Sequence, residues 1–141
     1  MKKAALLLIN KDDKFLLFQR DSYETTNPGK WGLLGGGIEE GETPEVALTR
    51  ELEEEAGVKD FTNFKKLDVY SNDGVELHVY YTTTFPIDKI KLNHEHRAQK
   101  WFTQEDVETE SKVIPTNVTF IKDYKKKNKL NEQIQRMKIL L

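Results

Sequence analysis

The sequence predicts a mixed α and β fold that forms a single domain over residues 1–141. Short apolar runs bounded by polar turns, which are typical of strands, alternate with longer segments that carry helix caps and helical spacing. The length of 141 residues is close to the usual size of one domain with one hydrophobic core. The composition, 37% hydrophobic and 33% charged, is typical of a globular protein and not of a disordered chain.

Six segments are predicted as strands, because each is a short apolar run between turn residues. They are residues 4–9, 15–19, 31–34, 64–70, 75–85 and 101–102. The polar turn NKDDK joins the first two segments, and Asn72-Asp73-Gly74 joins the fourth and fifth. We therefore expect two β-hairpins.

Three segments are predicted as helices from their caps. The first begins at Pro44 after the N-cap Thr43 and ends at Gly57, the second follows the N-cap Thr103, and the third begins at Thr116 and ends near residue 127. An apolar stripe then recurs at helical spacing: Leu130, Ile134, Met137 and Leu141. We expect this stripe to pack on its own domain and not to form a dimer contact.

Charge and residue types exclude several classes of function. The formal net charge of −2 argues against broad electrostatic binding of polymeric nucleic acid or of anionic membranes, and it leaves small charged ligands open. The chain has no cysteine, which excludes disulfides, thiolate nucleophiles and cysteine zinc sites. The apolar run from Ala4 to Ile9 is too short for a signal core or a membrane span. We therefore expect a cytoplasmic protein.

The first predicted helix concentrates glutamates in the stretch RELEEEAG, residues 50–57. At 100° per residue, Glu51, Glu54 and Glu55 fall within an arc of about 100°, whereas Glu53 points to the opposite side. An apolar stripe borders this arc and would anchor the helix on a sheet: Leu48, Leu52 and Ala56. Partial burial would increase the repulsion among the carboxylates, which Mg²⁺ or Mn²⁺ would neutralise. A solvated acidic face is the alternative that the helix alone leaves open.

The glycine-rich loop before the helix favours a ligand site. Gly36 and Gly37 are candidate substrate-binding residues, because glycines allow close backbone approach and such loops commonly lie beside phosphate oxygens. The stretch from Gly36 to Thr43 superficially resembles a P-loop, but Glu42 replaces the lysine that would contact the phosphates. No dinucleotide-binding G-x-G-x-x-G precedes a helix either. The sequence therefore argues against both nucleotide-binding motifs.

These residues together resemble the Nudix box, G-x5-E-x7-R-E-U-x-E-E-x-G-U, in which U is an aliphatic residue. The fixed positions are matched by Gly36, Glu42, Arg50, Glu51, Leu52, Glu54, Glu55, Gly57 and Val58. The order of the predicted elements also resembles a Nudix domain over nearly the whole chain. The resemblance implies an α/β/α sandwich with a mixed β-sheet between helices, and a hydrolase of nucleoside diphosphate derivatives that uses Mg²⁺ or Mn²⁺.

The resemblance also implies roles for individual residues. Glu51, Glu54 and Glu55 would bind the metal ion together with the carbonyl oxygen of Gly35, and Arg50 would orient the glutamates. The general base that takes a proton from water would be Glu51 or Glu54, and the sequence leaves both options open.

Two residues outside the box are further candidates. Arg20 follows the second predicted strand and would contact substrate phosphates, with a surface arginine as the equal alternative. Glu95 lies in a loop before Trp101, where many relatives supply one more carboxylate ligand to the metal. His94 and His96 flank Glu95 and are expected to be loop residues without a metal.

The resemblance predicts a divalent-metal-dependent hydrolase that cleaves phosphoric anhydride bonds. The compact chain is most similar to family members that hydrolyse (deoxy)nucleoside triphosphates, sometimes oxidised ones. Nucleotide sugars or other nucleoside diphosphate derivatives are alternative substrates, and a non-catalytic module that senses a nucleotide is an alternative of another class. The expected partner is a small nucleotide, and the expected state is a monomer or a homodimer.

Overall fold

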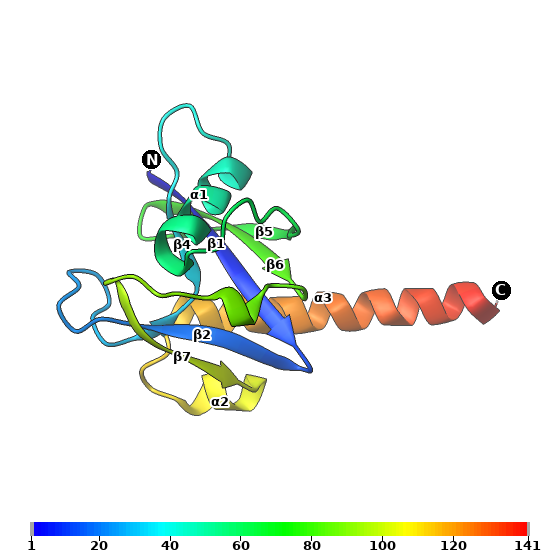
Figure 1. Cartoon of the computed structure of the whole chain (residues 1–141). Helices are drawn as coiled ribbons and strands as arrows, with labels where there is room; N and C mark the ends of the chain where they lie inside the picture. The colour runs from blue at the N-terminus through cyan, green and yellow to red at the C-terminus, as the bar shows by residue number, and fades with distance from the viewer. Residues whose placement is uncertain (1, 141) are drawn as a thin grey trace.

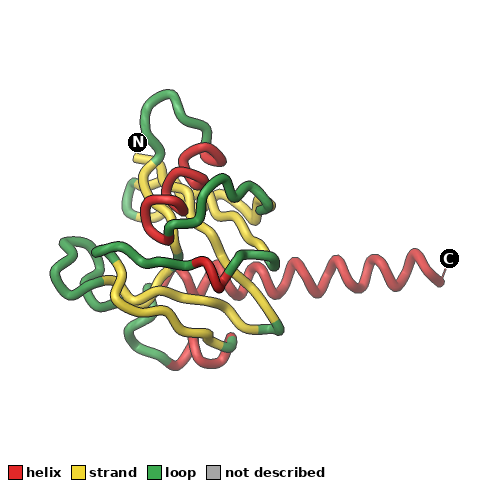
Figure 2. Tube along the Cα trace, in the orientation of Figure 1, coloured by secondary structure: helices red, strands yellow, loops and turns green. Residues whose placement is uncertain are grey.

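The computed structural model describes residues 2–140 as a seven-stranded sheet with helices on both sides (Figures 1 and 2). The strands are β1 (Lys2–Lys11), β2 (Lys14–Arg20), β3 (Trp31–Gly32), β4 (Leu34–Gly37), β5 (Lys65–Asn72), β6 (Val75–Thr82) and β7 (His96–Phe102). The helices are α1 (Pro44–Ala56), α2 (Gln104–Thr109) and α3 (Pro115–Leu140), with a short 3₁₀ helix over Ile87–Lys89. Strands β1 and β6 pair in parallel, whereas the other pairs are antiparallel.

The helices cover opposite faces of this mixed sheet. Successive residues of β1 alternate between two hydrophobic clusters, since Leu7 packs with Leu52 of α1 and Leu8 packs with Phe120 of α3. Helix α2 adds Val107 to the second cluster. The structure therefore confirms the predicted arrangement of a mixed sheet between helices.

The caps predicted for the first two helices are confirmed. The hydroxyl of Thr43 accepts a hydrogen bond from the backbone N–H of Val46 at 3.2 Å, and Gly57 ends α1 in the left-handed conformation with φ of 67°. Thr103 and Asp106 form a reciprocal capping box at the start of α2. Local signals therefore set these helix ends.

The glycine run differs from the prediction. The expected strand over residues 31–34 is divided at Leu33, so that β3 pairs with β2 and β4 pairs with β1. The glycines at 35–37, predicted as a loop, belong to β4. Gly35 has φ of +140°, and a Cβ there would lie 2.0 Å from the carbonyl oxygen of Ala5. Only glycine fits this close approach to β1, so a residue type that usually disfavours strands is required here.

The distal part of α3 is the largest departure. The helix predicted to end near residue 127 continues to residue 140, and its C-terminal half projects away from the sheet (Figure 1). Leu130, Ile134 and Met137 are 55%, 40% and 62% exposed, so the predicted packing of this stripe on its own domain is wrong. The fourth predicted member, Leu141, lies outside the described residues.

Helical geometry explains why the stripe is not buried. The part of α3 that packs on the sheet does so through Phe120, Ile121 and Tyr124. At 100° per residue, the stripe is rotated by about 120° around the helix from this buried face, and the sheet does not extend beneath it. Helix α3 is also too polar to cross a membrane, and no helix within residues 2–140 combines the length and apolar character that a membrane span requires.

Candidate functional site

Arg50 joins the acidic helix α1 to the strand and loop before it. Its guanidinium donates two hydrogen bonds to the carboxylate of Glu42, at 2.8 and 2.9 Å, and one to the carbonyl oxygen of Gly37, at 3.0 Å. The same group donates to Glu51 at 3.0 Å and to Glu54 at 3.3 Å. Its hydrogen bonds lower the pKa of Glu42 to about 2. Arg50 therefore fixes the positions of two predicted metal-binding glutamates.

Glu51 lies directly against the glycine strand. A Cβ at Gly36 would lie 2.6 Å from Oε1 of Glu51, so the absence of a side chain at Gly36 makes room for this carboxylate. Burial raises the pKa of Glu51 above its usual value, and repulsion from Glu54 and Glu95 adds to the increase. Glu54 lies at the solvent edge with its side chain 53% exposed. The two candidate general bases therefore have different environments.

Glu55 is the buried member of the group. Its side chain is 1% exposed, and its Oε1 accepts a hydrogen bond of 2.7 Å from the backbone N–H of Gly35. Burial is the main cause that raises the pKa of Glu55 to about 9, and the charges of Glu51 and Glu95 contribute in the same direction. The uncharged carboxyl is therefore favoured at neutral pH until a cation compensates for its charge.

The donor set fits a hard divalent cation. The side chains of Glu51, Glu54 and Glu55 supply only oxygen, which Mg²⁺ and Mn²⁺ prefer. Burial and repulsion from neighbouring carboxylates both disfavour the charged forms of Glu51 and Glu55, and a cation would relieve both. Within residues 2–140, no three or more His, Asp or Glu side chains already converge with the spacing of metal ligands.

Two further predicted ligands lie near the group. Gly35 contacts Glu55 through its N–H, while the role expected of its carbonyl oxygen stays a prediction. Glu95 is half-buried in the loop before β7, and its charge raises the pKa of both Glu51 and Glu55. Glu95 therefore shares the electrostatic environment of the box carboxylates.

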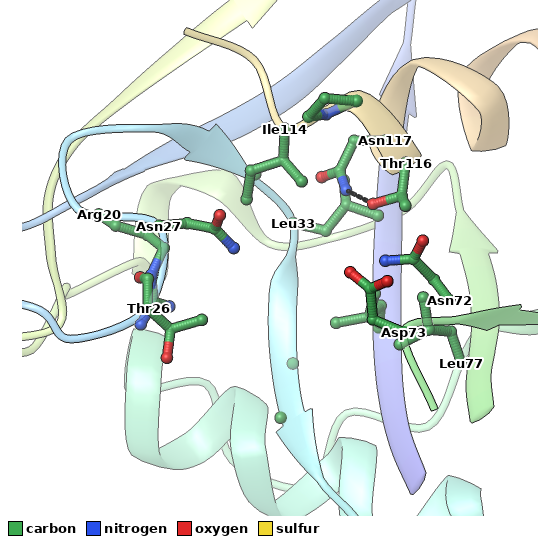
Figure 3. A pocket seen from close by; sticks show the side chains of 15 residues that line it. Arg20, Thr26, Asn27, Leu33, Asn72, Asp73, Leu77, Ile114, Thr116 and Asn117 are labelled. Atoms are coloured by element: carbon green, nitrogen blue, oxygen red, sulfur yellow. Dashed lines mark hydrogen bonds between the residues drawn. The ribbon is translucent and has the colours of Figure 1, made fainter. Parts of the chain in front are cut away.

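A cavity of about 660 Å³ opens beside the glycine strand (Figure 3). Gly35 and Gly36 line it, and so does Arg20. The side chain of Arg20 is held by the loop that follows it, because Nε donates a hydrogen bond of 2.6 Å to the carbonyl oxygen of Thr26. Gly37 does not line this cavity and contacts Arg50 instead. The structure thus brings together two of the three predicted substrate-binding residues.

The cavity contains polar residues that the sequence did not indicate. Asn117 of α3 is buried, and its Oδ1 has no hydrogen-bond partner. Asn72 and Asp73, predicted only as turn residues, lie on the wall across from Arg20 (Figure 3). No local motif indicates that Asn117 lines the cavity. Its position there depends on the pairing of residue 113 with Trp31 at the start of β3.

His96 was also missed. The sequence predicts a loop residue, whereas the structure buries His96 at the start of β7, with Nδ1 3.6 Å from Oε2 of Glu55. The loop prediction for His96 is therefore wrong, because β7 begins earlier than the apolar pair Trp101-Phe102 suggests. The first half of this strand is mostly polar, so a search for apolar runs does not identify it as a strand.

Comparisons with known proteins identify the family of this chain. Residues 1–124 match the family model described as the NUDIX domain. The nucleoside triphosphatase NudI of Escherichia coli O17:K52:H18 (strain UMN026 / ExPEC) is 32% identical over 114 residues, which cover 71% of this chain and 80% of that protein. The nucleoside triphosphatase NudI of Enterobacter sp. (strain 638) is 29% identical over 126 residues, which cover 80% of this chain and 89% of that protein.

Solved structures share the fold. The MutT protein from Methanosarcina mazei Go1 superposes with a TM-score of 0.75 at 24% identity, covering 91% of this chain and 95% of that one. The MutT NUDIX hydrolase from Burkholderia pseudomallei gives a TM-score of 0.73 at 24% identity, covering 86% and 96%. Together with the family match over residues 1–124 and the complete box, these findings show that the chain belongs to the Nudix hydrolase family.

Proposed function

We propose that this Nudix hydrolase is a divalent-metal-dependent pyrophosphohydrolase of (deoxy)nucleoside triphosphates. The observation that carries the proposal is the position of Gly36, which lines the cavity and also lies against Glu51. The cavity volume, about 660 Å³, is in the range of small-molecule sites. A nucleoside in the cavity would therefore place its phosphates beside the carboxylates. The names of the two relatives, both nucleoside triphosphatases, support the same substrate class.

The proposed metal site consists of Glu51, Glu54, Glu55 and the carbonyl oxygen of Gly35, with Glu95 as a candidate additional ligand. A bound Mg²⁺ or Mn²⁺ would neutralise the phosphates and lower the pKa of a water molecule.

The side chains of the chain itself perform the remaining tasks. Arg50 orients Glu51 and Glu54 through the hydrogen bonds described above. One of these two carboxylates takes the proton of the attacking water, as a general base within hydrogen-bond reach. Arg20 lies on the cavity wall, where its positive charge would attract phosphate oxygens.

The test compares two neighbouring glutamates of α1. Glu54→Gln removes a proposed catalytic carboxylate, while Glu53→Gln is the matched control, because Glu53 is exposed and points away from the arc. The proteins are incubated with nucleoside triphosphates, oxidised nucleotides and nucleotide sugars in Mg²⁺ or Mn²⁺, and the released pyrophosphate and phosphate are measured. We expect Glu54→Gln to be at least about 100-fold slower than the control.

Other outcomes would contradict the proposal in distinct ways. Equal turnover by Glu54→Gln and Glu53→Gln would refute the assignment of the carboxylates. Cleavage of nucleotide sugars alone would refute the substrate class. Tight nucleotide binding without turnover in either ion would identify a nucleotide-sensing module.

A further inference from the structure

A buried histidine faces the innermost glutamate of the proposed metal site. The side chains of His96 and Glu55 are each 1% exposed, and Nδ1 of His96 lies 3.6 Å from Oε2 of Glu55. This Nδ1 atom is buried and has no hydrogen-bond partner. An unpaired buried nitrogen is unfavourable, because it has lost its hydrogen bonds to water, so a site that contains one needs an explanation.

Both residues are held in place by their surroundings. Oε1 of Glu55 is fixed by the N–H of Gly35 at 2.7 Å, which leaves Oε2 as the oxygen that faces His96. His96 pairs with Arg20 of β2, and its ring packs on that of Phe18 in an edge-to-face arrangement with centroids 6.0 Å apart. The imidazole therefore has a defined position, in which Nδ1 is the ring nitrogen that lies near the carboxylate.

We propose that His96 is a positioning residue for Glu55, in which Nδ1–H donates a hydrogen bond to Oε2 when Glu55 binds the cation. An approach of about 0.7 Å converts the observed separation into an ordinary N–H···O bond. The carboxylate is then held at both oxygens, by Gly35 on one side and His96 on the other. Its remaining lone pairs are left for the metal ion.

The proposal rests on the metal site of the proposed function and assigns it a residue outside the box. Groups that hydrogen-bond to a metal ligand orient that ligand, and their loss commonly reduces metal affinity by about 10–100-fold. The competing explanation is that His96 only fills space beside Phe18. The first explanation requires a nitrogen at the position of Nδ1 for full metal affinity, whereas the second does not.

Three substitutions separate these explanations. Asparagine places its amide nitrogen near the position of Nδ1, glutamine places it nearer to Nε2, and phenylalanine keeps the ring without any nitrogen. Mn²⁺ affinity is measured on the full-length protein without substrate, from the electron paramagnetic resonance signal of free Mn²⁺. Thermal unfolding in EDTA reports separately on the stability of each metal-free variant.

We expect His96→Phe and His96→Gln to bind Mn²⁺ about 10–100-fold more weakly, and His96→Asn to stay within about threefold of the unsubstituted protein. Excess Mn²⁺ should restore the kcat of His96→Gln, since the ligands themselves remain. His78→Phe is the matched control, because His78 also has an unpaired Nδ1 but contacts Glu76 on the same strand, β6. This control should leave Mn²⁺ affinity unchanged.

Unchanged Mn²⁺ affinity in His96→Phe would overturn the proposal, and so would equal losses in His96→Asn and His96→Gln. If His96→Phe does not fold, the comparison of the asparagine and glutamine variants still decides the question. Failure of the unsubstituted protein to bind Mn²⁺ would overturn the metal site of the proposed function as well. Normal binding by both the unsubstituted protein and His96→Phe would overturn the role of His96 alone.

Discussion

Two helical segments carry apolar stripes at helical spacing and lie in opposite environments. In α1, Leu48, Leu52 and Ala56 are completely buried against the sheet. In the distal half of α3, Leu130 and Met137 are more than half exposed. Apolar spacing predicts a helix correctly, whereas burial of the stripe depends on whether another element lies beneath it.

The two segments also differ in the hydrogen bonds and ion pairs that connect them to the rest of the domain. Helix α1 is capped at both ends, and Arg50 links it to the preceding strand. The last side-chain contacts of α3 with the sheet are made by Lys127, which donates to the carbonyl oxygen of Leu67 and to Asp68. Within the described chain, no side-chain hydrogen bond or ion pair joins residues 128–140 to the domain.

Gly35→Ala should destabilise the region beneath α1 by about 4 kcal/mol, since backbone strain and overpacking each cost about 1–3 kcal/mol. The new Cβ would lie 2.0 Å from the carbonyl oxygen of Ala5. Gly37→Ala is the matched control, because a Cβ there meets no atom within 4 Å. Urea unfolding of the metal-free variants measures both effects, and equal stabilities would contradict the close approach of β4 to β1.

Leu52→Ala should cost about 3 kcal/mol, within the range of 2–5 kcal/mol for buried leucines. Leu130→Ala makes the same chemical change in the distal part of α3 and should alter the free energy of unfolding by less than about 0.5 kcal/mol. Chemical denaturation of the two variants compares the helices directly. A large loss in Leu130→Ala would show that the stripe is buried in solution, which would break the contrast.

The buried carboxyl of Glu55 should make the stability of α1 depend on pH. Its pKa of about 9 in the folded protein exceeds the ordinary value of 4.5, so the folded state holds an extra proton between these values and loses stability as the pH rises. His96 acts oppositely between about 4 and 6.5, because burial lowers its pKa to about 4. The clear window is therefore pH 6.5 to 9, where the slope should approach about 1.4 kcal/mol per pH unit.

Denaturant unfolding in EDTA across this window tests the prediction. Glu55→Gln should abolish the slope, because glutamine has no proton to lose. Glu132→Gln is the matched control in the exposed part of α3 and should keep the slope of the unsubstituted protein. If Glu55→Gln keeps the full slope, another group controls the pH dependence.

Ending the chain after Asn128 should have the smallest effect. The removed segment has only exposed residues in its described part, so the free energy of unfolding should change by less than about 0.5 kcal/mol. Nucleotide hydrolysis by the shortened protein should match that of the full chain. A loss of activity or stability would show that the distal helix contacts the domain after all.

The helix caps and the hydrophobic pattern predicted most of the fold. Thr43, Gly57 and Thr103 act within a few residues of themselves, so their signals are readable in the sequence alone. The glycine strand and the extent of β7 were missed because both depend on pairing with distant strands. The exposed stripe on α3 could not be predicted either, since helical spacing does not reveal where the sheet ends.

The site was predicted to a similar extent. The box placed its glutamates on one helix, and the structure brings Gly35, Gly36 and Arg50 to them. Asn117 and His96 escaped prediction because each comes from a different element and reaches the site only through the order of strands. A linear motif identifies residues of one helix and of the loop before it. The residues that line a cavity come from several strands and helices, so no linear motif contains them.

The parallel pairing of β1 with β6 has a consequence for synthesis of the chain on the ribosome. Lys2 lies opposite Val75 and Ile9 lies opposite Thr82. Strand β1 therefore cannot form this pairing until β6, which follows it by more than seventy residues, has been synthesised. Such non-local pairing slows folding, and α1 emerges before this central pair can close. The nascent chain therefore carries an unfinished sheet until β6 has left the exit tunnel.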